Sequence, residues 1–521
     1  MVTPADILSA LGGRIDGLRS SGPRRGVGIV VLVVLAALAW YFRPWLHGPV
    51  YWVYTTPMLP IAAVVGVALA LFVHRTLDGF GDGRFEIAAF VLVVLVATTA
   101  TGLVAGETLG KATMADSSQA SNLSETDPGK PRVVTKSVAS RYASNTLNFP
   151  QYRIEGGDIT VRDGTPYWSY ALAPDGAYNH YTKRQHGTVL VDMTRQNAEV
   201  DTVVGDIEKG IGPAFYRNYR FSMLKGANYL VEYHDPFMVV HEDDQYVAVP
   251  YSKPQFHLLP LPHTTPEWGG VVLIDREGTV TDLSPAAARD HPVLEEQKLY
   301  PFSLARRSVA ATKYRNGIVN TFTSHEDEIE VAPVPGEGND QPFLVFTEEG
   351  PEYVVAVEPY GQAQGLKEVW TIDSRTGEYE VYRPEASLFG ARKATDYVRQ
   401  AARTTDWNRF TPAEPIPVVV DGQLYWEVRV VPQDSSGIAY IAFVNARSTD
   451  VHEVSTNEEV AAFLEGERVE TGGGGTADGD RTPTLVVERV APNGTVLETL
   501  EVYGNETVRV VPGNETNGTA G

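Results

Sequence analysis

After residue 140 the chain repeats one pattern of apolar and polar positions four times. An apolar run leads into an acidic or glycine-bearing turn, and a tyrosine then opens a second apolar run that closes near a proline. The two best copies read ITVRDGTPYWSYALAP at 159–174 and VVVDGQLYWEVRVVP at 418–432, and two looser copies occupy 236–250 and 342–359. Runs rich in Val, Ile and Tyr that are split by a short Asp-Gly turn are typical of a β-hairpin. The pattern therefore predicts four hairpins.

A further apolar strand follows each hairpin and ends in an Asp or Asn that leads through a short turn into another strand. Each of these Asp residues is also a candidate metal ligand or catalytic carboxylate. Because the same position recurs in four copies, we favour a turn, in which Asp bonds its own backbone and Gly accepts a positive φ. The residues predicted to turn the chain are Asp163, Gly164, Asp192, Asp275, Asp373, Gly377, Asp421 and Gly422.

Helical periodicity follows the strands and is clearest at 383–403, interrupted by prolines at 283–312 and looser at 203–221. Ser455 and Glu458 have the spacing of a capping box that opens a helix at 458–464. Each unit is thus about four strands plus a helix, so we predict an α+β fold built from tandem antiparallel-sheet-plus-helix modules. The predicted module boundaries are 137–225, 226–315, 316–404 and 405–467. A Gly-rich linker at 468–483 then leads to a β-hairpin and tail at 484–521.

Three apolar segments that lack charged residues precede the repeats, at 26–42, 50–73 and 87–105. Each is about long enough to cross a hydrocarbon core of roughly 30 Å, and buried helices of a soluble protein are the alternative. The segment before them, 1–25, carries four arginines, whereas the first loop carries one. The positive-inside rule therefore predicts a three-helix transmembrane anchor with a cytoplasmic N-terminus and a large extracellular C-terminal domain. A linker rich in Ser, Asp, Thr and Pro is predicted at 106–136.

Two stretches, at 425–454 and 369–379, resemble PepSY-like and cystatin-like modules, which are small α+β domains of extracytoplasmic and membrane proteins. The resemblance rests on Tyr-Trp-Glu-Val-Arg-Val followed by Val-Asn-Ala and Val-His-Glu-Val in the first stretch. It rests on Val-Trp-Thr-Ile-Asp-Ser-Arg-Thr-Gly-Glu-Tyr in the second. The first two copies lack the Trp in the turn strand, and no family site maps onto this chain. The resemblance implies binding or inhibition.

Charge is distributed unevenly. The chain has a net charge of −22, and the residues after 111 carry 35 basic and 59 acidic side chains. So acidic a domain repels nucleic acid, which we exclude as a partner. Only 11 of the 43 basic residues are Lys. Excess carboxylate with scarce Lys is typical of haloarchaeal proteins, and an ordinary acidic protein from a GC-rich genome is the alternative. The absence of cysteine excludes disulfides and thiolate metal sites.

Acceptor patterns for N-glycosylation concentrate at the C-terminal end, which agrees with an extracellular location. An Asn-Gly-Thr-rich tail composition is the alternative. The candidate sites are Asn122, Asn493, Asn505, Asn514 and Asn517.

No motif names a reaction, and we predict no catalytic residue, cofactor or metal. His234 and His241 lie near carboxylates, but a solvated strand edge explains them more simply than a metal site. We therefore expect a membrane-anchored cell-surface binding or structural protein of an envelope, secretion, conjugation or virus-related assembly, whose partners are the lipid bilayer and other envelope proteins. Two alternatives are a PepSY-like regulator or inhibitor of an exported peptidase and an enzyme with a site between repeats.

Overall fold

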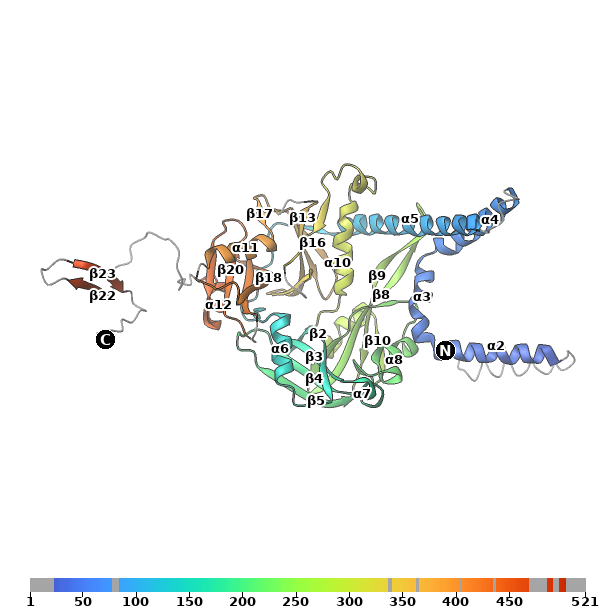
Figure 1. Cartoon of the computed structure of the whole chain (residues 1–521), viewed down its shortest axis with the longest axis horizontal. Helices are drawn as coiled ribbons and strands as arrows, with labels where there is room; N and C mark the ends of the chain where they lie inside the picture. The colour runs from blue at the N-terminus through green and yellow to red at the C-terminus, as the bar shows by residue number, and fades with distance from the viewer. Residues whose placement is uncertain are drawn as a thin grey trace, which may run out of the picture. The chain divides into compact units, whose positions relative to one another are not determined.

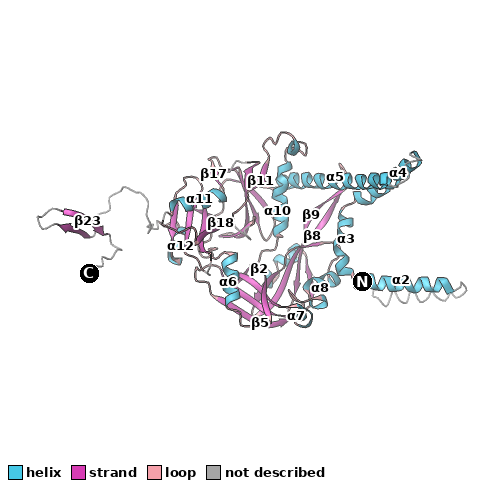
Figure 2. Ribbon diagram, viewed as in Figure 1, coloured by secondary structure: helices cyan, strands magenta, loops and turns pink. Residues whose placement is uncertain are grey.

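The protein is an α+β chain with several antiparallel sheets, and its computed structural model is shown in Figures 1 and 2. It forms two compact units, residues 1–472 and 473–521. The structure describes residues 23–76, 84–335, 340–361, 365–402, 404–433, 437–467, 485–490 and 496–502. In the second unit, β22 (Leu485–Val490) pairs antiparallel with β23 (Val496–Val502), and the predicted Asn493-Gly494 turn between them lies outside the described residues.

Two or three helices of the first unit are long and apolar enough to cross a membrane. The two single helices are α4 (Met58–Thr76) and α5 (Arg84–Asp116). The third candidate is a pair, α2 (Pro23–Tyr41) and α3 (Arg43–Thr55), whose axes meet at 87°. In Figure 1, α3 runs across the direction of α2 and α5.

The helix boundaries differ from those predicted. The predicted span 50–73 is divided between α3 and α4, because the chain leaves helical geometry at Thr56, where φ is −117° and ψ is 73°. Thr56 precedes Pro57, and a residue before proline is disfavoured in the α conformation. The predicted span 87–105 is also too short, since α5 continues to Asp116.

The last turns of α5 pack tightly on the body of the protein. They contact α10 (Phe302–Ala311) and the short helix η4 (Thr312–Tyr314). A Cβ added at Gly110 would lie 2.3 Å from the Ala311 carbonyl oxygen, and one added at Gly106 would lie 2.7 Å from the Tyr314 ring. Only glycine permits so close an approach between a helix and its neighbour.

Four mainly antiparallel sheets follow, and a helix precedes the main run of strands in each of them. The first sheet has the order β2 (Tyr152–Arg162), β3 (Thr165–Pro174), β4 (Gln185–Asp192) and β5 (Val200–Ile207), after helix α6 (Lys136–Asn145). The second joins β10 (Val280–Leu283), β9 (His263–Ile274), β8 (Asp244–His257) and β6 (Glu232–Tyr233), with β7 (Phe237–His241) also on β8, after α8 (Tyr219–Gly226).

The third sheet follows α10 and takes one strand from far upstream. Its order is β1 (Ser118–Ala120), β16 (Tyr379–Tyr382), β15 (Glu368–Asp373), β13 (Gly350–Pro359) and β11 (Ile329–Val331), with β12 (Phe343–Thr347) on β13. The fourth joins β18 (Phe410–Val420), β19 (Gln423–Pro432), β20 (Tyr440–Asn445) and β21 (Val451–Val454), after α11 (Ala391–Ala401) and before α12 (Asn457–Leu464). The largest buried apolar cluster draws residues from all four sheets, for example Trp168, Phe237, Tyr353 and Val431.

The two hairpins with the best sequence copies have tight two-residue turns. Asp163 and Gly164 have φ of 51° and 78°, and Asp421 and Gly422 have φ of 50° and 70°. Two consecutive positive φ angles are the geometry of a type I′ turn, whose twist matches the flanking strands.

The later Asp residues bond the backbone just after them. Each carboxylate accepts a hydrogen bond from an N–H two to four positions further along, at 2.6–2.8 Å, and Gly377 has φ of 77°. The acceptors are Asp192, Asp275 and Asp373, and the donors are Thr194, Thr279 and Arg375.

Several helices differ from their predicted places. The helix predicted at 383–403 is α11, which begins at Ala391 and packs mainly on β18, β19 and β20, so it covers the sheet that follows it rather than the one before. The helix predicted at 203–221 is a strand up to Ile207, a short 3₁₀ helix at Phe215–Arg217 and an α-helix only from Tyr219. The capping box is shifted by one residue, because Thr456 and Glu459 form it.

The segment predicted as a linker, 106–136, is ordered against two sheets. Beyond the end of α5 it supplies β1, which pairs parallel with β16. Thr126 then exchanges hydrogen bonds with the backbone of Val419 at 2.9 and 3.1 Å, and Val133 is fully buried. Paired backbone and buried side chains are the opposite of a flexible tether.

A buried arginine fastens the same segment to the fourth sheet. Arg429 donates from Nε to the Val133 carbonyl at 2.9 Å and from Nη1 to the Glu414 carbonyl at 2.8 Å. Its Nη2 lies 3.1 Å from a carboxylate oxygen of Glu427, and both side chains are almost fully buried. The two backbone hydrogen bonds of the buried guanidinium thus tie Val133 to β18 of the fourth sheet.

Candidate functional site

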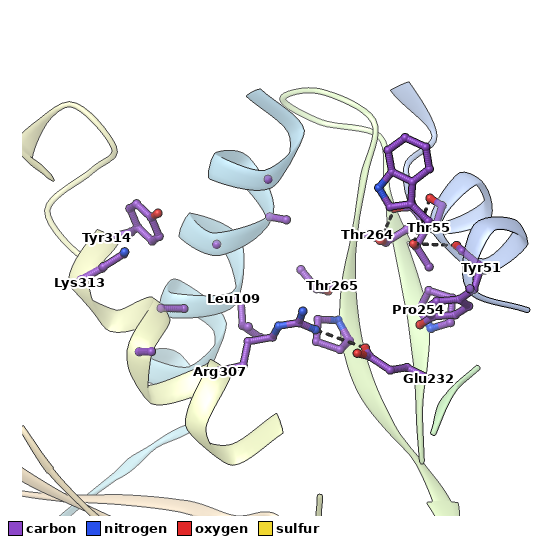
Figure 3. Close-up of a pocket in the computed structure, with 18 residues that line it drawn as sticks. Tyr51, Thr55, Leu109, Glu232, Pro254, Thr264, Thr265, Arg307, Lys313 and Tyr314 are labelled. Carbon is purple, nitrogen blue, oxygen red and sulfur yellow. Dashed lines mark hydrogen bonds and ion pairs between the residues drawn. The ribbon is translucent and has the colours of Figure 1, made fainter. Parts of the chain in front are cut away.

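A groove with a volume of about 520 Å³ lies where the apolar helices meet the sheets. Figure 3 shows α5 in its middle, with Lys313 and Tyr314 on one side and the β8–β9 strands with Thr264 and Thr265 on the other. The far wall is α3, which contributes Tyr51 and Thr55.

The wall of the groove that α5 provides is lined by small residues. Gly102, Ala105 and Gly106 line it, and Gly48 of α3 and Ala310 of α10 add further small side chains. These residues leave room for an apolar chain between the helices. Hydroxyl groups mark one edge, where Thr264 donates from Oγ1 to the Thr55 carbonyl at 2.7 Å.

Charged side chains also line the groove. Arg307 of α10 lies 3.4 Å from Glu232 of β6, and both side chains are more than a third exposed. An exposed pair of this kind stabilises by about 0–1 kcal/mol, so it can open for a ligand at small cost. The lining residues include no nucleophile beside a base. The groove is therefore suited to binding an amphipathic chain.

Helix α3 is seated on the second sheet at the edge of this groove. His47 is 6% exposed, and its Nε2 lies 3.0 Å from the Val231 carbonyl oxygen. Tyr229 donates its hydroxyl to the Arg43 carbonyl at 2.8 Å, and its ring packs edge-on against His47. A buried imidazole with a backbone partner fixes the helix in rotation as well as in position.

A second cavity of about 440 Å³ lies between the sheets. Its lining comes from the first three sheets and from the start of α10. Lys298 is 9% exposed and pairs with Asp158, and its ammonium group lies 5.3 Å from the centre of the Phe237 ring. Arg132 also lines this cavity and donates to the Leu344 carbonyl at 3.1 Å.

One histidine of the second cavity connects two serines. Nδ1 of His234 lies 2.6 Å from Oγ of Ser303, and Nε2 lies 3.1 Å from Oγ of Ser252. Burial lowers the pKa of His234 against the opposing effect of the nearby Glu232 carboxylate, which favours the neutral imidazole. In the tautomer that carries its proton on Nε2, the imidazole accepts a hydrogen bond from Ser303 at Nδ1 and donates one to Ser252, which is the arrangement of a general base beside a hydroxyl nucleophile.

The residues singled out from the sequence do not converge on one site. The Asp and Gly turn residues lie at separate strand ends. Asn122 is exposed just after β1, whereas Asn493, Asn505, Asn514 and Asn517 lie outside the described residues. Within the described part of the chain, no group of three or more His, Cys, Asp or Glu side chains could hold a metal ion.

The Ser303–His234 contact could not be found from the sequence. The two residues are 69 positions apart and belong to different elements, and no local pattern connects them. His234 stood out beside His241, but its partners are serines rather than the neighbouring carboxylates.

Comparisons with known proteins give little. No family model matches the chain, and no curated protein matches it. Among solved structures, the chain is similar to a putative glycoside hydrolase from Parabacteroides distasonis ATCC 8503, at 10% identity over 65% of this chain and 83% of that one. The TM-score is 0.17, so this similarity carries no argument about fold or activity.

The serine–histidine pair can be tested directly. If Ser303 is activated by His234, a fluorophosphonate probe will label the purified chain, and both Ser303→Ala and His234→Ala will abolish the labelling. Ser324→Ala, which removes another exposed serine hydroxyl, serves as the control and should leave it unchanged. Labelling of the wild type no stronger than that of Ser303→Ala would assign the pair a purely structural role and remove the case for an enzyme.

Proposed function

We propose that this is a membrane-anchored cell-surface binding or structural protein, a component of an envelope, secretion, conjugation or virus-related assembly. Residues 1–25 lie in the cytoplasm and the sheets lie outside. The apolar helices, the basic residues before the first of them and the strongly acidic body support this arrangement.

We also infer that the four helix–sheet segments are copies of one module. The support is their common order, a helix followed by a run of mainly antiparallel strands, most of which pair with a neighbour in the chain. On this proposal the PepSY-like resemblance applies to the single module. The modules share one apolar core and are not independent domains.

The observation that carries a binding role is an apolar loop held rigidly away from the core. Val319 and Phe322 are 72% and 67% exposed. The loop is closed behind them by Asn320, whose side chain accepts a hydrogen bond from the Glu326 N–H and donates one to the Glu326 carbonyl, both at 3.0 Å. Asn316 donates to the same carbonyl at 2.9 Å.

A stacked pair supports the loop from the third sheet. The ring of His325 stacks on Tyr360 at 4.3 Å, and its Nδ1 lies 2.6 Å from Glu328. A preordered loop loses little entropy on binding, and exposed aromatic and branched side chains are the usual anchors of protein interfaces. The loop is therefore a candidate contact for another envelope protein.

Labelling of single cysteines tests the orientation, since the chain has none of its own. Gln400→Cys lies on the exposed face of α11, and Ser9→Cys lies in the N-terminal segment. A membrane-impermeant maleimide should label Gln400→Cys in intact cells and Ser9→Cys only after the cells are permeabilised. The reverse pattern would show that the body is cytoplasmic.

A pull-down from membranes in mild detergent tests the assembly role. Val319→Ser/Phe322→Ser should reduce the captured partner at least about tenfold, because removing a hot-spot anchor commonly costs about 2 kcal/mol or more. Tyr178→Ser/Val204→Ser removes two other exposed apolar side chains and should have no effect.

Quantitative mass spectrometry of the captured proteins gives the result. A wild-type chain that comes down alone would argue against an assembly. Equal capture by the loop variant and the wild type would show that the partner binds elsewhere.

A further inference from the structure

One segment of the body reverses the charge of the rest. Residues 209–231 contain Lys209, Arg217, Arg220 and Lys225 and no Asp or Glu, although the chain as a whole has a net charge of −22. The segment forms the short helix η2 (Phe215–Arg217) and α8. None of the four cations pairs with a carboxylate within the described residues.

This basic segment lies where the chain leaves α2 and enters α3. Lys225 donates to the Trp40 carbonyl at 2.8 Å, and its ammonium group lies 5.2 Å from the centre of the Trp40 ring. Trp45 packs against both Phe215 and Phe221 with ring centres 5.7 Å apart.

The aromatic side chains around the cations are partly exposed. The exposed fraction is 56% for Trp40, 48% for Trp45 and 55% for Tyr216. Lys209 lies 5.1 Å from the centre of the Tyr216 ring. Tryptophan and tyrosine interleaved with lysine and arginine are the composition of a protein surface at the level of lipid headgroups.

The other end of α3 has an apolar counterpart. Tyr54 packs edge-on against Phe256 near the tip of the β8–β9 hairpin, with ring centres 5.2 Å apart. Leu258 and Leu259 at this tip are 78% and 82% exposed. One end of α3 thus adjoins cationic side chains, and the other end adjoins exposed apolar side chains. The outer face of α3 carries exposed Leu46 and Val53.

A lipid bilayer is the partner that satisfies all of these groups together. The helices α4 and α5 are apolar enough to cross it, and the pair α2–α3, which passes the same test only as a whole, is bent by 87°. This bend places α3 along the membrane surface when α2 crosses it. We propose that Lys209, Arg217, Arg220 and Lys225 bind the phosphates of anionic lipids in the leaflet on which α3 lies. The site rests on the membrane placement proposed above but not on the protein partner or on the side of the membrane.

Hydrogen exchange of the full-length chain in nanodiscs tests this site. Amides of 209–231 should exchange at least about fivefold more slowly in discs with 30% phosphatidylglycerol than in discs of phosphatidylcholine alone, since each basic residue near an anionic surface gains about 1 kcal/mol. This difference should be lost in the quadruple variant Lys209→Gln/Arg217→Gln/Arg220→Gln/Lys225→Gln. A control variant makes the same charge change on other exposed surface and should keep the exchange-rate difference. Its substitutions are Arg195→Gln/Arg392→Gln/Arg399→Gln/Arg447→Gln.

Three outcomes would overturn the proposal. In the first, the exchange rate of the wild-type amides is the same with and without phosphatidylglycerol. In the second, both quadruple variants lose the rate difference equally. The third is a full effect of inorganic phosphate added to phosphatidylcholine discs, which would assign the site to a free anion. All variants are compared at a salt concentration at which their thermal unfolding matches the wild type. If the wild-type chain captures no partner in the pull-down but its exchange still depends on phosphatidylglycerol, the assembly role fails and the lipid site stands.

Discussion

The close approach of α5 to the body is the contact on which the rest of the structure depends. Gly110 lets the helix backbone touch the Ala311 carbonyl, so the helix does not end in a hinge at the membrane but runs into the fold. The chain then enters the third sheet through β1 within two residues of the helix end. Together with His47 of α3, these contacts join the apolar helices and the sheets into one body.

The segment after α5 joins the sheets to one another. Thr126 bonds the backbone of the fourth sheet and also bridges Thr347 of the third, and Arg429 holds Val133. Because the largest apolar cluster draws residues from all four sheets, the stability of one sheet depends on its neighbours. The loop that presents Val319 and Phe322, the cavity at His234 and the basic segment therefore keep fixed places relative to the apolar helices.

Local signals predicted the hairpins well, because a turn such as Asp421-Gly422 and the strands beside it are specified by a few neighbouring residues. Periodicity predicted that the face of α11 with Ala394 and Val398 is buried but not which sheet covers it. Hydropathy counts apolar residues without regard to direction, so it merged α3 with α4 across Thr56. The composition of 106–136 predicted a flexible linker. Composition does not reveal the hydrogen bonds that order this segment, because bonds such as the one between Thr126 and Val419 join positions almost 300 residues apart. A separation of 69 positions likewise hid the contact between Ser303 and His234.

With these contacts in place, the apolar helices and the sheets move as one body. Spin labels on Val96→Cys in α5 and Gln400→Cys in α11 test it by double electron–electron resonance in nanodiscs, since the chain has no other cysteine. The structure predicts one narrow distance distribution, which Gly110→Leu broadens and Gly102→Ala leaves unchanged, because a Cβ at Gly102 meets nothing within 4 Å. A broad distribution in the wild type, equal to that of Gly110→Leu, would show that a flexible tether joins the apolar helices to the sheets.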